Sequence, residues 1–155
     1  DLPLRFPGSE KTWHSIVDHT DAGLLADATL WAATSQTAQN QAFNVNNGDI
    51  WRWCELWPRI ASWFELASAP PVRLSFHQLF VDYRAYWREL AGQSLVEADI
   101  LRLSEGKFAD FVFGWNYDMF GDGSKLRRAG FTEMQATDDM FFRLFAQLRA
   151  ARIIP

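Results

Sequence analysis

A helical repeat of apolar residues runs through most of this 155-residue sequence, whereas its strand candidates are short. Apolar residues recur at spacings of three and four, which places them along one face of an α-helix. The segments of this kind are 20–33, 53–64, 76–90, 96–113 and 137–152. Only 3–7 and 42–45 resemble strands, and strands this short cannot form an independent sheet. We therefore expect a mostly α chain with a few short strands that pair with partners outside the sequence.

Polar residues mark where several helices are expected to begin. A hydroxyl oxygen accepts a hydrogen bond from the free N–H groups of a first helical turn. The expected N-caps are Thr20, Ser124 and Thr137. Gly130 is expected to end the second of these helices. Because Pro58 cannot donate a backbone hydrogen bond, the helix predicted over 53–64 is expected to kink there or to begin only near Trp57.

The composition is that of a globular protein and argues against several other classes. Hydrophobic residues make up 48% of the chain and charged residues 22%. The net charge of -4 disfavours a nucleic-acid-binding protein, which would carry clustered excess Lys and Arg. No apolar run approaches the ~20 residues of a membrane span. The single cysteine, Cys54, excludes an intramolecular disulfide, so we expect a cytoplasmic location.

Aromatic residues are unusually abundant, with eight Trp and thirteen Phe. Because a buried ring covers roughly 150 to 250 Å², this total exceeds what the core of one small domain needs. Some rings are therefore expected to face a missing domain, a partner or a ligand, and the chain alone is expected to self-associate. Core packing is the alternative for any single ring.

The residues that a nicotinamide-dependent oxidoreductase needs are missing from the sequence. The one Gly-x-Gly, Gly121 to Gly123, has Leu126 in place of the third glycine of a dinucleotide-binding G-x-G-x-x-G. A short-chain dehydrogenase also needs Tyr-x-x-x-Lys, in which the lysine lowers the pKa of the phenol. No lysine here follows a tyrosine at that spacing. We therefore expect neither catalytic nor cofactor-binding residues in this chain.

The histidines and the cysteine do not form a recognisable reactive site. His14, His19 and His77 are not paired at the i, i+4 spacing that puts two imidazoles on one helix face, so no metal site is expected. Cys54 lies in an apolar series between Trp53 and Trp57 and is expected to be an inert core thiol. A nucleophile with His19 or His77 as its base is the alternative.

Several motifs together resemble one protein family. VDHTDAGLLA at 17–26 is followed by QAFNVNNGDI at 41–50, and later by ELWP at 55–58, SKLR at 124–127 and RIIP at 152–155. This combination resembles atypical, extended short-chain dehydrogenases/reductases, and among them the progesterone 5β-reductase and iridoid synthase-like proteins and their bacterial relatives. The resemblance runs across nearly the whole chain.

The resemblance implies a fold and an activity for the intact parent protein. Members reduce an enone, an enal or a similar carbonyl compound with NAD(P)H, using a Rossmann domain and a smaller helical substrate domain. The glycine fingerprint and the catalytic Tyr and Lys belong to a preceding half. We therefore expect residues 1–155 to be a single fragment, the C-terminal portion of an α/β Rossmann-type protein, made of a helical substrate-binding region with late Rossmann elements. NAD(P)H is expected in the parent and no cofactor in this chain alone.

The resemblance also implies where a substrate would lie. The helix matching 106–115 leans over the nicotinamide in this family, so the expected substrate-binding residues are Phe108, Phe111, Val112 and Trp115. These residues share one face of a helix, but a plain core helix would show the same spacing.

Two readings of function follow from these observations. In the first, the chain is the substrate-binding half of an NAD(P)H-dependent oxidoreductase acting on a small hydrophobic carbonyl, enone or enal compound. Its expected partners are that substrate, the missing N-terminal Rossmann half and a possible second copy, without nucleic acid or membrane. In the alternative, the chain is a stand-alone, non-enzymatic helical module for ligand binding or dimerisation.

Overall fold

Helices form most of the chain that the structure describes, which comprises residues 2–94 and 104–154. In this computed structural model the described elements are β1 (Leu4–Arg5), α1 (Glu10–His14), β2 (Ile16–Val17), α2 (Ala22–Thr34), the 3-10 turn η1 (Gln36–Ala38), β3 (Trp51–Arg52), α3 (Trp53–Trp63), β4 (Ser68–Ala69), α4 (Phe76–Asp82), α5 (Arg84–Ser94), α7 (Lys107–Phe113), α8 (Ser124–Ala129) and α9 (Thr137–Ala150). The predicted mostly helical character is confirmed. Part of the helix predicted over 96–113 lies outside the described residues.

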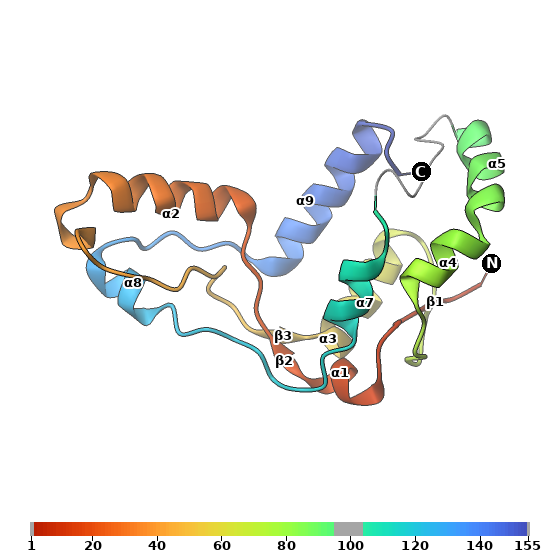
Figure 1. Cartoon of the computed structure of the whole chain (residues 1–155), viewed down its shortest axis with the longest axis horizontal. Helices are drawn as coiled ribbons and strands as arrows, with labels where there is room; N and C mark the ends of the chain where they lie inside the picture. Colours follow the sequence, from red (N-terminus) through yellow and green to blue (C-terminus); the bar gives the residue numbers. More distant parts are fainter. Residues whose placement is uncertain (1, 95–103, 155) are drawn as a thin grey trace.

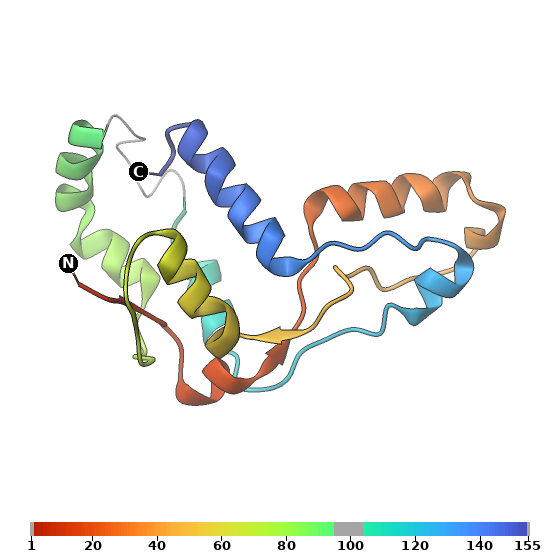
Figure 2. The ribbon, with the colours of Figure 1, turned by 180° about the vertical axis from the view of Figure 1, so that it is seen from behind.

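The elements are spread along an elongated molecule. Figure 1 shows α2 and α8 together at one end and α4, α5 and α7 at the other, with β2 and β3 between them. The view from behind in Figure 2 shows the same separation, with α9 rising between the two ends. The helix that carries the predicted substrate-binding residues, α7, is therefore remote from α2.

The strands are short, and within the described residues each pairs with one other strand. β1 is parallel to β4, and β2 is antiparallel to β3. A single bridge joins Val17 of β2 to Met119. The strand predicted over 3–7 is confirmed as β1.

The prediction that residues 42–45 form a paired strand is wrong. This part of the chain runs as a stretched segment beside α2 (Figure 1) and has no regular secondary structure. Phe43 and Val45 pack on a core cluster that α2 shares with α8, while Asn44 between them is exposed, so the side chains do alternate as in a strand. The backbone N–H groups of residues 42 to 46 donate no hydrogen bond to any described residue. The described chain offers this segment no neighbouring strand, and a ladder therefore does not form.

Phe6 is the centre of the main hydrophobic core. Its side chain is fully buried, and the rings of Trp57 and Phe113 each lie 5.3 Å from it in near-perpendicular packing. Trp53 lies 5.5 Å from the same ring. These contacts join the residue that follows β1 to α3 and α7. Part of the aromatic surplus is thus ordinary core packing.

The helix caps differ from those predicted, because the expected hydroxyls are engaged elsewhere. Asp21, not Thr20, caps α2 by accepting from the N–H of Leu24, while the hydroxyl of Thr20 donates to the carbonyl oxygen of Val45. Thr137 is the first residue of α9 rather than its cap, and its hydroxyl donates to the carboxylate of Asp49.

The predictions about the ends of α8 and α3 are confirmed only in part. Ser124 is the first residue of α8 and Gly123 its cap, whereas Gly130 ends that helix in the left-handed conformation, as predicted. α3 begins at Trp53 and continues through Pro58, so a start near Trp57 is wrong.

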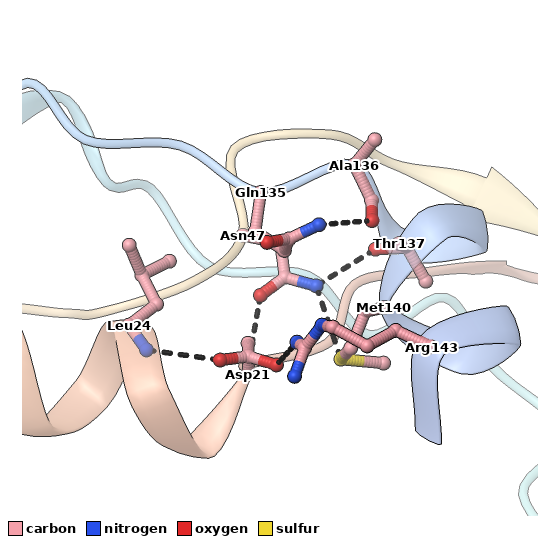
Figure 3. A network of polar contacts seen from close by, with 8 residues as sticks. All are labelled: Asp21, Leu24, Asn47, Gln135, Ala136, Thr137, Met140 and Arg143. Atoms are coloured by element: carbon pink, nitrogen blue, oxygen red, sulfur yellow. Dashed lines mark hydrogen bonds and ion pairs between the residues drawn. The ribbon is translucent and has the colours of Figure 1, made fainter. Parts of the chain in front are cut away.

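Asn47 joins three distant parts of the chain through a buried polar network, shown in Figure 3. Its side chain is fully buried, its Oδ1 accepts from the N–H of Asp21 at 2.6 Å, and its Nδ2 donates to Thr137 Oγ1 at 3.0 Å. Its backbone N–H donates to His19 and its carbonyl oxygen accepts from Gln135. The start of α2, the turn before β3 and the start of α9 therefore meet at one asparagine.

An ion pair closes the same network. Arg143 Nη2 of α9 lies 2.5 Å from Asp21 Oδ2. The hydrogen bond from the N–H of Leu24 and the charge of Arg143 together hold the pKa of Asp21 below its usual value, although burial acts in the opposite direction. The carboxylate thus caps α2 and ties it to α9.

Asp110 fixes α7 against the start of α4. Its carboxylate accepts from Ser75 Oγ at 2.8 Å, from the N–H of Phe76 at 2.5 Å and from the N–H of His77 at 3.2 Å. Burial raises the pKa of Asp110, but these three hydrogen bonds outweigh it and the net shift is downward. Gly106, with φ of 74°, allows the close approach, since a Cβ there would lie 2.6 Å from the backbone nitrogen of His77.

Asn47→Ala is expected to lower the free energy of unfolding by about 3 kcal/mol, because it leaves the buried N–H of Asp21 without an acceptor and removes a donor to the buried hydroxyl of Thr137. Asn44→Ala is the matched control, since Asn44 is exposed, and its effect should stay within about 0.5 kcal/mol. Urea unfolding of both variants checks this. A loss below about 1 kcal/mol for Asn47→Ala would contradict the assignment.

The contribution of Asp110 to stability is expected to depend on pH. Because its folded pKa is lowered, the stabilisation is present above the unfolded value near pH 4 and is lost as the pH falls through the folded pKa. Asp110→Asn should therefore be less stable than the parent at pH 7, and the difference should shrink on acidification. Asp27→Asn, on an exposed side of α2, serves as the control. A stability difference that is unchanged from pH 7 to pH 3 would argue against an ionised anchor.

Candidate functional site

The predicted substrate-binding residues lie on α7 and just beyond its end. Phe108 is 76% exposed and Phe111 is 61% exposed, while Val112 and Trp115 are half-buried. The rings of Phe111 and Trp115 lie 5.2 Å apart in near-perpendicular packing. We call the surface made by these four residues the α7 face. The structure brings them together on one side of α7.

The opposite side of α7 supplies the core contact that holds the helix. Phe113 lies 5.0 Å from the ring of Trp53, 5.5 Å from that of Phe76 and 5.3 Å from that of Phe6. An alternative in which the α7 face is the core side of the helix is therefore wrong for Phe108 and Phe111. Large apolar rings left in solvent in one patch are typical of a surface that something else covers.

Tyr117 extends the α7 face and was not anticipated from the sequence. Its ring stacks on that of Trp115 with centroids 6.2 Å apart and 28° between the planes. It lies beyond the helix, so the i, i+3, i+4 pattern that selects the other four residues cannot find it. Trp115 Nε1 is buried and has no hydrogen-bond partner among the described residues.

The one Gly-x-Gly turn does not fit the pyrophosphate of a dinucleotide. The N–H of Gly121 already donates to Asp18 Oδ2 at 2.8 Å, and a carboxylate in this position repels phosphate. A Cβ on Gly123 would lie 2.8 Å from Asn46 Oδ1 and 2.9 Å from Arg127 Nη1, so side chains fill the space that phosphate would need. The turn instead holds two parts of the chain together through the hydrogen bond between Gly121 and Asp18.

Burial shifts the pKa values of both His19 and Cys54. His19 is packed 5.0 Å from the ring of Trp51 and 5.3 Å from that of Phe141, and burial lowers its pKa. Burial raises the pKa of the Cys54 thiol, which makes it a poor nucleophile. In the part of the chain described, no three His, Cys, Asp or Glu side chains gather where they could hold a metal ion.

Within the described residues, no helix combines the length and the apolar character needed to cross a membrane. The longest, α9, has 14 residues.

Comparison with known proteins connects this geometry to a family. A family model for the PRISE-like Rossmann-fold domain matches residues 2–155. The chain is 30% identical over 157 residues to 3-oxo-Δ(4,5)-steroid 5-β-reductase of Arabidopsis thaliana. It is 32% identical over 159 residues to (S)-8-oxocitronellyl enol synthase of Antirrhinum majus. Each alignment covers 99% of this chain and 40% of the relative, so the chain spans less than half the length of these relatives.

The match covers almost the whole chain and agrees with the motifs read from the sequence. The resemblance to progesterone 5β-reductase and iridoid synthase-like proteins is thereby confirmed. The narrower expectation, that the chain is the C-terminal fragment of a dehydrogenase, stays a prediction. The chain belongs to the family of PRISE-like Rossmann-fold domains.

Proposed function

We propose that this chain is the substrate-side part of an NAD(P)H-dependent reductase that acts on a small hydrophobic enone, enal or similar carbonyl compound. The observation that carries the proposal is the exposed α7 face in a chain of the PRISE-like family. Phe108 and Phe111 present apolar surface without a charged group between them on that face, which suits a neutral, apolar ligand.

The α7 face is suited to binding because it is held rigidly without using its own side chains. Phe113 fastens the helix to the aromatic core, and Asp110 fastens it to α4. The exposed rings of Phe108 and Phe111 are therefore free to contact a ligand. A surface fixed in this way loses little conformational entropy when it binds.

The nucleotide-binding part of the reductase is proposed to lie in sequence that the relatives have and this chain does not span. Two features support a docking partner of that kind. The backbone N–H groups of residues 42 to 46 have no partner among the described residues, so a neighbouring strand could pair with them. The second feature is α2, which is apolar on most of its sides and therefore leaves apolar side chains in solvent: Leu25 is 46% exposed and Leu30 is 66% exposed.

In this proposal, NAD(P)H would bind to the nucleotide-binding part and would supply the hydride. The present residues bind the apolar substrate, orient it and exclude water from one side of it. None of Phe108, Phe111, Val112 and Trp115 carries a group that could protonate a carbanion or an enolate, so a catalytic acid would have to come from outside these four residues.

The proposal is tested by joining this chain to the part of the Arabidopsis 5-β-reductase that it does not match. The fusion is expected to oxidise NADPH in the presence of progesterone or of an apolar enal, as followed by absorbance. The 155-residue chain alone is the control and is expected to bind neither NADH nor NADPH in a calorimetric titration. A fusion that folds and binds NADPH but reduces none of a panel of enones and enals would contradict the proposal.

Within that fusion, Trp115→Ala is expected to change KM or substrate preference at little cost in stability, because the ring belongs to the α7 face. Phe113→Ala is the matched aromatic control and should lose roughly 3 to 5 kcal/mol of folding stability, since it removes a core ring. Steady-state kinetics and urea unfolding separate the two effects. The assignment of Trp115 fails if its variant unfolds as readily as the Phe113 variant and keeps the parent's substrate preference.

A further inference from the structure

Asn116 lies just beyond the end of α7, in sequence between Trp115 and Tyr117, whose rings stack on each other. Its Oδ1 accepts a hydrogen bond from Ser9 Oγ at 2.6 Å and another from Thr12 Oγ1 at 3.2 Å. These partners are more than 100 residues away in the sequence. The amide therefore ties the chain beyond α7 to the beginning of α1.

The two hydroxyls that hold Asn116 are themselves fixed. Ser9 is the N-cap of α1 and accepts from the N–H of Thr12 at 3.1 Å. Thr12 is only 3% exposed, and its hydroxyl lies 2.9 Å from that of Ser9. Because Ser9 Oγ already accepts from the backbone, its proton is free to point at Asn116. The acceptor of Asn116 thus meets donors whose positions a helix cap sets.

The chain around this contact is closely packed. A Cβ on Gly8 would lie 3.0 Å from the carbonyl oxygen of Phe113 and 2.5 Å from the ring of Phe6. The segment before α1 therefore runs directly against the last turn of α7. Only a residue without a side chain at Gly8 lets Ser9 come within reach of Asn116.

Trp115 has no polar anchor of its own. Its Nε1 finds no acceptor among the described residues, and its ring packs against those of Phe111 and Tyr117. Ring contacts alone allow sliding, whereas hydrogen bonds fix direction. The nearest polar anchor along the chain is the side chain of Asn116. Within α7 itself, the corresponding anchor is Asp110 in the first turn.

We propose that Asn116 is a positioning residue that sets Trp115 and Tyr117 in place at one end of the α7 face. This inference rests on the proposed function only where it concerns substrate. Binding and turnover depend steeply on the placement of the groups that contact a substrate. Asn116 does not itself belong to the α7 face and acts through the two rings beside it.

The test compares variants that keep or remove the acceptor. Asn116→Asp keeps an oxygen for Ser9 and Thr12, whereas Asn116→Leu has a similar size and no acceptor. Ser9→Asp still caps α1 but cannot donate to Asn116, so it removes the shorter of the two hydrogen bonds from the other side and serves if Asn116→Leu fails to fold. Gln39→Leu makes the same change from amide to leucine at an exposed residue outside both the α7 face and the segment 42–46, and is the control.

The first readout is the NMR spectrum of the 155-residue chain. The Trp115 to Tyr117 ring cross-peaks and the Trp115 indole N–H resonance are expected to change in Asn116→Leu and Ser9→Asp and to stay at the parent positions in Asn116→Asp and Gln39→Leu. A merely structural role would lower the melting temperature without moving these signals. Unchanged signals in Asn116→Leu and Ser9→Asp, or equal changes in Asn116→Asp, would overturn the proposal.

The second readout is kinetic and uses the fusion described above. Loss of the contact is expected to raise KM for progesterone about three- to tenfold, with a smaller change in kcat, and Asn116→Asp should restore it. An unchanged KM in Asn116→Leu would overturn the link to substrate. If the parent fusion reduces no enone at all, the proposed function fails, and the NMR comparison still decides the positioning role by itself.

Discussion

The arrangement of the molecule depends on the buried side chain of Asn47. An amide this deep in a protein is costly unless all of its donors and acceptors are used, and here they are: the two backbone groups bond His19 and Gln135, and the side chain bonds Asp21 and Thr137. The partners come from two distant parts of the chain, His19 and Asp21 before α2 and Gln135 and Thr137 at the start of α9. The direction in which α2 and α9 leave the centre is therefore determined by the geometry of one residue.

The two ends of the molecule, one at α2 and the other at α7, have different surfaces. The α2 end keeps a backbone segment whose N–H groups have no partner among the described residues, together with exposed leucines, and both suit another protein region. The α7 end keeps exposed rings on a helix that is fastened from behind by Phe113 and Asp110, which suits a small apolar ligand. The stability of the chain and the proposed recognition by it thus use different residues of the same helix.

Periodicity predicted the helices and the grouping on α7 well, since spacing alone decides which side chains share a face. It could not say which face is buried: Phe113 is in the core and Phe108 is not, because that depends on where Phe6 and Trp53 lie. Cap residues were misassigned for a similar reason. The hydroxyls of Thr20 and Thr137 are drawn to distant acceptors, and no local pattern encodes those.

The central claim is that this chain docks onto a nucleotide-binding region, and hydrogen exchange at residues 42 to 46 tests it most directly. In the 155-residue chain these backbone amides have no described partner, so they are expected to exchange rapidly. In the fusion that binds NADPH, a neighbouring strand should protect the N–H groups that point toward it. Rapid exchange at every one of these amides in both proteins would contradict the claim.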